Sequence, residues 1–288
     1  MDDIYFSFGP NQAFYFSGPK YLKWRGFPSS IQEDCPPDNI RKVRCLAMGR
    51  NDSEEAFFVY DAKDGQIWSC ISGSFIKKYP KLYDWMKEQG TPKLRMAFGP
   101  DYEGYPGYQG YLVWKTDSSA SYALIPKQTE AAEKRHKVGR LKLATFGVGW
   151  AYFYLQADGI FHYNFMGHYH TLGGIIRKYR LKAGDIQFLA LNPYYVEEFF
   201  LLLSNKTAIF RVPLSYRTAL EKALTRHGIK IEQALTSQRV ENEPKVPAQA
   251  RDTKFWDGLA QRVAGQAAGA VVSQVAGALV GLAACNVM

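Results

Sequence analysis

Three histidines lie within nine residues of one another in the segment FHYNFMGHYH, at His162, His168 and His170. Side chains alternate along a strand, so an extended segment would place His168 and His170 on the same side, where they could chelate a metal. No carboxylate or cysteine lies nearby in the sequence to complete the coordination shell. We therefore expect no bound metal and keep the three histidines as possible ligand-binding residues.

A second group of candidate residues lies in the segment GPDYEGYPGYQGY, which spans residues 99–111. Aromatic rings at Tyr102, Tyr105 and Tyr108 could stack on a sugar or on a proline-rich peptide. The composition also fits, and more simply, a long mobile loop with exposed aromatic side chains. The three tyrosines therefore remain possible ligand-binding residues.

The sequence contains none of the common catalytic motifs: no GxSxG elbow, no HExxH, no phosphate-binding GxxxxGK and no GxGxxG after a strand. The cysteines at 35, 45, 70 and 285 are widely spaced and form no CxxC pair. This spacing favours a reducing, intracellular setting over a disulfide framework or a zinc cluster. We expect a non-enzymatic protein without a cofactor, although loops distant in sequence could still assemble an active site.

The composition indicates a globular, strand-rich protein. The chain has 288 residues, of which 47% are hydrophobic and 15% aromatic, enough for a substantial core. Its net charge of +9 would suit an anionic partner. The basic residues are scattered, however, so nucleic acid is an unlikely partner. The first residues, MDDIYF, carry two acids and do not resemble a secretory signal peptide.

The tail after Arg262 lacks charged side chains and is rich in small residues. A polar, proline-containing stretch at 233–254 predicts a flexible linker, and no charged side chain follows Arg262. Residues 263–284 would form a helix about 33 Å long. Small residues recur every four positions on one face of that helix, where another backbone could approach closely. They are Gly265, Gly269, Ser273, Gly277 and Gly281.

The final tetrapeptide, Cys285-Asn286-Val287-Met288, resembles a CaaX prenylation box. The resemblance implies a farnesyl group on Cys285, with Val287 as the second aliphatic position and Met288 as the terminal residue associated with farnesyl. It also implies removal of the last three residues and carboxyl methylation. Asn286 departs mildly from the pattern, at a position that tolerates variation.

One lipid chain gives only weak, reversible membrane binding, so a second membrane signal is expected. The tail offers no neighbouring cysteine and no strong polybasic run, which leaves the helix of 255–288 as that signal. A spanning helix would place Cys285 across the membrane from the cytosolic transferase, so we favour a helix that lies on the surface and self-associates. A disordered Ala/Gly tail is the alternative.

The body contains a degenerate repeat. Each repeat begins with an alternating strand that stops at a turn residue, continues with an aromatic or aliphatic strand, and ends with a third strand after a tight turn. Asn can replace Gly where the backbone needs a positive φ. The turn residues are Gly9, Gly49, Gly99, Gly147 and Asn192. Segments with helical spacing, such as SYRTALEKALTRHG, separate some repeats.

The turn residues are 40, 50, 48 and 45 positions apart, which is the size of one propeller blade. We therefore expect an all-β fold: a five-bladed β-propeller-like domain over 1–232, with three or four antiparallel strands in each blade, followed by a C-terminal Ala/Gly-rich helix. The pattern resembles the degenerate repeats of fungal-type propeller proteins and lacks the signatures of WD40 repeats. An irregular β-sandwich or barrel is the alternative.

Together these features predict a lipid-anchored binding or scaffold protein on the cytosolic face of a membrane, with a cytosolic pool. The propeller would recognise a protein partner of unknown identity. Two other functions remain open. The tail could be an oligomerising, membrane-perturbing effector, or the propeller could be a glycan-binding lectin or a hydrolase.

Overall fold

The computed structural model describes residues 4–18, 21–26, 31, 39–49, 55–102, 108–126 and 139–237. The chain divides into two units, Met1–Gln238 and Arg239–Met288, and only the first contains described residues. The predictions for the small-residue helix and for Cys285, Val287 and Met288 therefore lie outside them.

The described residues form five small β-sheets, numbered here 1 to 5 in chain order. The first strands of sheets 1 to 5 are β1 (Tyr5–Phe8), β4 (Ile40–Met48), β7 (Leu94–Asp101), β10 (Leu141–Phe146) and β13 (Ile186–Leu191). The second strands are β2 (Phe14–Gly18), β5 (Ala56–Ala62), β8 (Gln109–Lys115), β11 (Tyr152–Gln156) and β14 (Phe199–Leu203). The third strands are β3 (Tyr21–Arg25), β6 (Ile67–Ile71), β9 (Ser121–Leu124), β12 (Phe161–Asn164) and β15 (Thr207–Pro213). The first three strands of each sheet pair antiparallel, so the predicted repeat of three strands is confirmed and the fold is mainly β.

Sheet 5 differs from the prediction in its fourth strand. β16 (Lys230–Ser237) pairs parallel with β15, whereas only antiparallel strands were expected. A parallel neighbour requires a crossover connection, and the helix α6 (Leu214–Arg226) supplies it. β16 also runs past residue 232, because the polar stretch that suggested a linker begins with residues of this strand.

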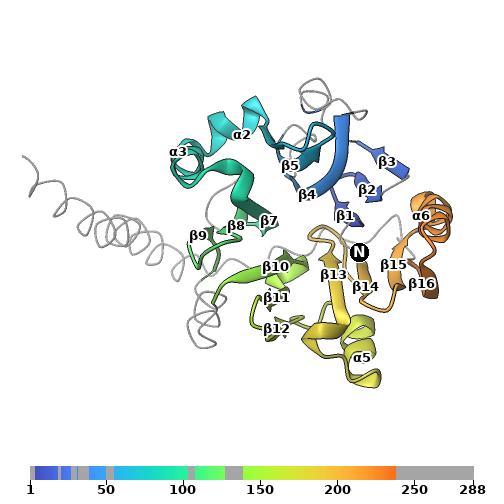
Figure 1. Cartoon of the computed structure of the whole chain (residues 1–288). Helices are drawn as coiled ribbons and strands as arrows, with labels where there is room; N and C mark the ends of the chain where they lie inside the picture. Colours follow the sequence, from blue (N-terminus) through green and yellow to red (C-terminus); the bar gives the residue numbers. More distant parts are fainter. Residues whose placement is uncertain are drawn as a thin grey trace, which may run out of the picture. The chain divides into compact units, whose positions relative to one another are not determined.

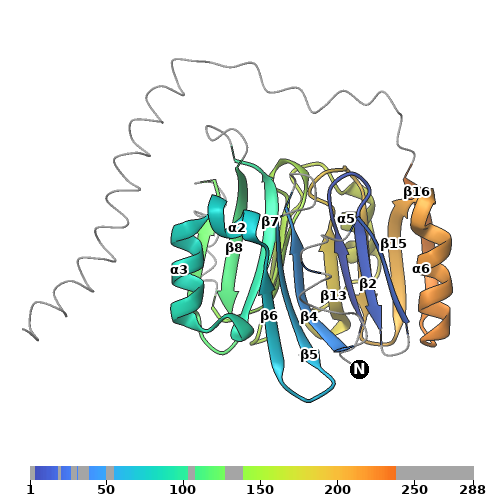
Figure 2. The ribbon, with the colours of Figure 1, turned by 90° about the horizontal axis from the view of Figure 1, so that it is seen from above.

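Helices connect or flank the sheets where the sequence shows helical spacing. They are α2 (Gly73–Lys78), α3 (Pro80–Gln89), α5 (His170–Lys178) and α6, with short 3₁₀ helices η2 (Thr91–Lys93), η3 (Val148–Trp150) and η4 (Ala183–Asp185). Ser72 caps α2, since its hydroxyl accepts a bond from the Phe75 N–H, and Pro80 occupies the first turn of α3. Figure 2 shows α3 and α6 alongside the outer strands.

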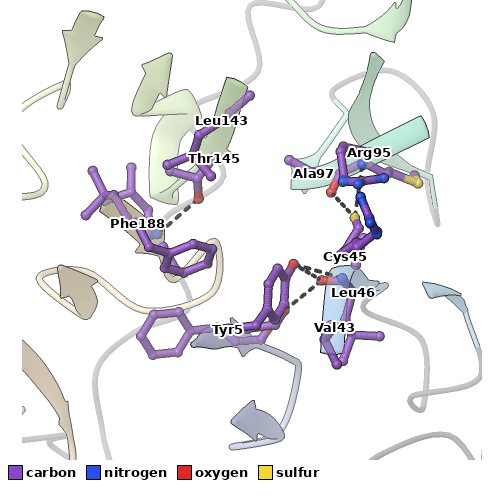
Figure 3. A pocket seen from close by; sticks show the side chains of 18 of the residues that line it. Tyr5, Val43, Cys45, Leu46, Arg95, Ala97, Leu143, Thr145 and Phe188 are labelled. Atoms are coloured by element: carbon purple, nitrogen blue, oxygen red, sulfur yellow. Dashed lines mark hydrogen bonds between the residues drawn. The ribbon is translucent and has the colours of Figure 1, made fainter. Parts of the chain in front are cut away.

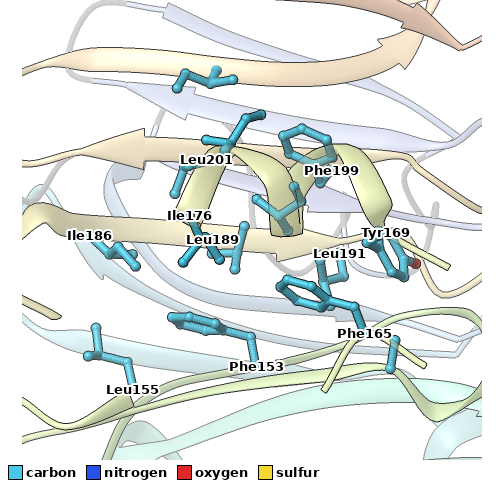
Figure 4. Close-up of a cluster of buried hydrophobic side chains, with 14 of the residues drawn as sticks. Phe153, Leu155, Phe165, Tyr169, Ile176, Ile186, Leu189, Leu191, Phe199 and Leu201 are labelled. Atoms are coloured by element: carbon cyan, nitrogen blue, oxygen red, sulfur yellow. The ribbon is translucent and has the colours of Figure 1, made fainter. Parts of the chain in front are cut away.

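The hydrophobic core is divided among the spaces between sheets. Buried apolar clusters in the described part of the chain lie between sheets 1 and 2, 2 and 3, 3 and 4, 4 and 5, and 5 and 1. Figure 4 shows the cluster between sheets 4 and 5, where Phe153 and Leu155 face Leu189, Leu191 and α5. Among the first strands, which lie innermost in Figure 1, β1 packs against β4 and β13, β4 against β7, β7 against β10, and β10 against β13.

The turn residues that end the first strands do not have the predicted backbone conformation. A positive φ was expected at Gly9, Gly49, Gly99, Gly147 and Asn192, and none of these residues has one. Glycine is required by close contacts instead. A Cβ atom would lie only 2.6–2.8 Å from the nearest side-chain atom at the first three positions and 2.3 Å from one at the fourth.

Positive φ values occur at the second turn of the repeat. Gly65 and Gly159 have φ values of +86° and +87°, as expected for glycine in a tight Asp-Gly turn. The side chains of Asp64 and Asp158 each accept a bond from the backbone N–H two residues further on, at 2.9 and 3.1 Å. These two predicted turns are confirmed, whereas Ser17-Gly18, predicted as a turn, ends β2.

Gly147→Ala is expected to lower the free energy of unfolding by about 2–4 kcal/mol. The new Cβ would displace the Tyr169 hydroxyl, which accepts a bond from the Val148 N–H at 3.0 Å and donates one to the Asn192 carbonyl at 2.6 Å. Gly174→Ala in α5 is the control, since its Cβ meets open space and alanine favours helix by about 1 kcal/mol. Urea denaturation measures both variants, and an unchanged midpoint for Gly147→Ala would contradict the close-contact explanation.

Candidate functional site

A cavity of about 300 Å³ lies between the five first strands and is called here the inner cavity. Three positions of every first strand line it, at four, two and one residues before the turn residue that ends the strand. Four residues before the turn are Tyr5, Cys45, Arg95, Leu143 and Phe188. Two residues before it are Ser7, Ala47, Ala97, Thr145 and Ala190. One residue before the turn are Phe8, Met48, Phe98, Phe146 and Leu191.

The cavity exists because of this sequence pattern. Protein interiors are packed closely, so space remains only where side chains are too short to fill it. All residues two before the turn are alanine, serine or threonine, and the larger side chains four before the turn form the walls. Figure 3 shows Arg95 and Cys45 across the cavity from Leu143 and Phe188.

Polar side chains of the cavity hydrogen-bond to the backbone of a neighbouring first strand. The Tyr5 hydroxyl accepts from the Leu46 N–H at 2.8 Å and donates to the Leu46 carbonyl at 3.0 Å, linking β1 to β4. The Cys45 thiol accepts from the Met96 N–H at 3.2 Å, linking β4 to β7. These bonds satisfy backbone groups at the edges of separate sheets, which would otherwise be costly to bury.

Cationic side chains gather on one wall and at one end of the cavity. Arg44 donates two bonds to the buried Asp61 carboxylate, which Arg41 also approaches at 3.8 Å. Arg95 lies beside Arg44 and forms no ion pair with any residue of the described ranges. Its hydrogen bonds go to the backbone carbonyls of Leu94, at 2.6 Å, and Pro92, at 3.3 Å. Burial lowers the pKa of its guanidinium below the ordinary value.

The turn end of the cavity is covered by the loop after β13. Pro193 lines the cavity, and the Tyr194 hydroxyl donates to the Met48 carbonyl at 3.1 Å and accepts from the Gln109 amide at 3.2 Å. Asn192 holds the base of this loop, because its side-chain oxygen accepts the Tyr194 N–H at 2.9 Å. One loop of sheet 5 thus contacts sheets 2 and 3.

The ionisable groups of the cavity favour binding over catalysis. Burial raises the pKa of the Cys45 thiol and raises that of the Tyr5 phenol well above its ordinary value. Both groups are therefore protonated at neutral pH, and a protonated thiol is a poor nucleophile. The arrangement offers hydrogen bonds, a cation and apolar surface without an activated nucleophile.

The predicted histidines do not share a strand. His162 lies on β12, which ends at Asn164, whereas His168 lies in a turn against Gly149, and His170 begins α5. The alternation that would have put His168 and His170 on the same side therefore does not apply. In the part of the chain that the structure describes, no three His, Cys, Asp or Glu side chains gather as metal ligands.

The predicted tyrosines occupy the two ends of one loop. Tyr102 makes an edge contact with Trp150, with ring centroids 6.2 Å apart, and Tyr108 makes one with Tyr79 at 5.6 Å. Tyr108 is 38% exposed, which leaves ring surface for a ligand. Tyr105 lies outside the described residues.

Two acidic side chains that stand directly before second strands are buried. Glu55 is 3% exposed and pairs with Lys78 and the Tyr79 hydroxyl, and Glu198 is fully buried and accepts from the Asn192 amide at 2.7 Å. Both stand directly before a second strand and face the turn residue of their own sheet. They tether turns to neighbouring elements and do not serve as surface charges.

Of the cysteines in the described residues, Cys45 is a free thiol and Cys70 is disulfide-bonded. A disulfide is more typical of oxidising compartments than of the expected reducing one. No helix within the described ranges is long and apolar enough to cross a membrane. No family model, curated protein or solved structure matches the chain, so the functional argument rests on the cavity and the sequence.

Sequence reasoning did not find the inner cavity, although the signal was present. Aligning the five first strands on their turn residues places Tyr5, Cys45, Arg95, Leu143 and Phe188 at one position. Small residues fill the position two before the turn in every strand. The alignment alone does not show that these positions from separate sheets face one another.

Thr145→Val is expected to lower the free energy of unfolding by about 1–3 kcal/mol, because it removes the acceptor of the buried Leu191 N–H, which now donates at 3.0 Å. Thr116→Val is the matched control, since the Thr116 hydroxyl is bonded at an exposed site. Its effect should stay within about 0.5 kcal/mol. Urea denaturation compares the two variants, and equal effects would show that the bond between β10 and β13 adds nothing.

Proposed function

We propose that the five sheets are the blades of a closed five-bladed β-propeller. Support comes from the distribution of the core: every sheet shares one buried cluster with the sheet before it and another with the sheet after it, and sheet 5 shares one with sheet 1. The contacts among first strands follow the same cyclic order. A β-sandwich would instead place one core between two large sheets.

The propeller is a non-enzymatic binding module, and the inner cavity is its ligand site. The observation that carries this function is the composition of the cavity, which combines an unpaired cation with an apolar wall and contains no activated nucleophile. Ligand sites of proteins are concave, mostly apolar and supplied with a few polar groups. The outer loops, including Tyr108, remain available to a protein partner.

The tail holds the propeller at the cytosolic face of a membrane, with a soluble pool in exchange. This part of the proposal rests on the sequence: Cys285, Val287 and Met288 supply a farnesylation signal, and the small-residue helix supplies the second membrane contact. The Cys70 disulfide argues against a cytosolic location. One intact-mass measurement, made after free thiols are blocked in a eukaryotic lysate, reports both the farnesyl group on Cys285 and the oxidation state of Cys70.

Cys285→Ser is expected to move most of the protein from the membrane fraction to the soluble fraction of a eukaryotic host, because one farnesyl chain provides the reversible part of the binding. The intact mass of the wild type should show one farnesyl group and the loss of three residues. Met288→Leu, which shifts the signal towards geranylgeranyl, should keep the protein on the membrane. Unchanged membrane recovery of Cys285→Ser would refute lipid anchoring.

A second candidate function makes the tail the effector, and the small residues from Gly265 to Gly281 favour it. A peptide covering residues 255–285 is then expected to release dye from liposomes. Gly269→Leu together with Gly277→Leu should abolish the release, because bulky side chains prevent close helix contact. Gln266→Leu, off the small-residue face, is the control. Membrane binding without dye release would leave anchoring as the only function of the tail.

The third candidate, a lectin or hydrolase, depends on Tyr102 and Tyr108 or on the histidines. Tyr102 and Tyr108 contact different partners, Trp150 and Tyr79. Binding to a glycan array by residues 1–238 would support the lectin.

A further inference from the structure

Arg95 brings a positive charge to the inner cavity, where the nearby Asp61 carboxylate favours that charge less than Arg44 opposes it. A guanidinium has five N–H donors. Within the described residues, its hydrogen bonds use Nη1 alone, towards the Pro92 and Leu94 carbonyls, and no carboxylate forms an ion pair with it. The neighbouring Arg44 is already neutralised by Asp61. The Nε and Nη2 groups of Arg95 are therefore available to a ligand.

Arg95 is half-buried, and a charge that is partly removed from water is stabilised by an anion beside it. Burial is the largest cause of the lowered pKa of Arg95; Arg44 lowers this pKa further, and the Asp61 carboxylate raises it. Lys42 and Lys142 also line the cavity and add to its positive potential. The positive side chains that line the cavity therefore favour the binding of an anion beside Arg95.

The opposite wall selects for an apolar group. Leu143 and Phe188 line it, and the Tyr5 ring contacts the Phe188 ring edge-on with centroids 5.2 Å apart. The Tyr194 loop covers one end, so a ligand enters from the other. A volume of about 300 Å³ lies at the low end for ligand sites and admits only a small molecule.

We infer that the inner cavity binds a small organic carboxylate, with the carboxylate on Arg95 and a short apolar body against Leu143 and Phe188. A carboxylate matches the fork of a guanidinium in shape and in charge. This inference rests on the proposed binding function and names the ligand class of that site. It is independent of the lipid on the tail.

The test uses octanoate as the probe and the full chain from a bacterial host, which adds no prenyl group. Titration calorimetry should show saturable binding of octanoate to the wild type. Arg95→Met should weaken that binding by about 10- to 100-fold, the worth of hydrogen bonds to a charged group. Lys222→Met, which removes an exposed charge on α6, is the matched control and should bind as the wild type does.

Two further measurements separate the charge from the apolar wall. Neutral 1-octanol should bind more weakly than octanoate to the wild type and equally to wild type and Arg95→Met. Ala97→Val reduces the cavity without changing its charge, so it should weaken octanoate and 1-octanol alike. Thermal unfolding of every variant shows that it is folded, and Arg95→Gln, which also removes the charge, replaces Arg95→Met if the latter is not.

Three outcomes would overturn the inference, and they differ in whether the cavity remains a binding site. If octanoate and 1-octanol bind equally and Arg95→Met changes neither, the carboxylate class is wrong and the cavity remains a binding site. Binding of inorganic phosphate in place of octanoate, lost in Arg95→Met, would refute the apolar body. If none of the three probes binds the wild type, both the ligand class and the cavity as the functional site are refuted.

Discussion

The structure depends on how five separate sheets satisfy the backbone groups of their innermost strands. Each first strand has a partner strand on one side only, and its other edge faces the first strands of other sheets. Side chains of neighbouring first strands supply the missing partners, as Tyr5 does for Leu46, Cys45 for Met96 and Thr145 for Leu191. Glycine recurs where the first strands end for a separate reason, because side chains such as those of Glu55, Trp150 and Tyr169 lie where a Cβ would stand. The arrangement of the first strands also leaves the inner cavity, because short side chains occupy the position two before each turn.

Local patterns in the sequence predicted the strands and the Asp-Gly turns well, because alternation and turn chemistry are properties of a few consecutive residues. The predicted role of the turn glycines was wrong, because contacts with residues distant in sequence determine it. Gly99 is required because Trp150 of sheet 4 packs on it, with atoms 2.8 Å from where a Cβ would stand. A contact between residues 51 positions apart leaves no mark in the neighbourhood of either one.

The positions of the histidines and of the buried acids also depend on structure that the local sequence does not show. His168 and His170 look alternating in the sequence, yet a turn and the start of α5 interrupt the strand. The burial of Glu55 and Glu198 cannot be predicted from their neighbours in sequence, because their partners Lys78 and Asn192 come from other elements. The cavity was missed because it is built from positions in five repeats, and only the arrangement of the sheets brings those positions together.

The Tyr194 loop has a consequence for how the protein reaches its native state. Its hydrogen bond to Met48 joins residues 146 positions apart. A contact of this span can form only after nearly the whole body has been synthesised, and such non-local contacts make folding slow. Sheets 2 and 3 are therefore synthesised before the loop whose Tyr194 hydroxyl hydrogen-bonds to both of them. During this interval the nascent chain is vulnerable to aggregation and is a natural client for chaperones.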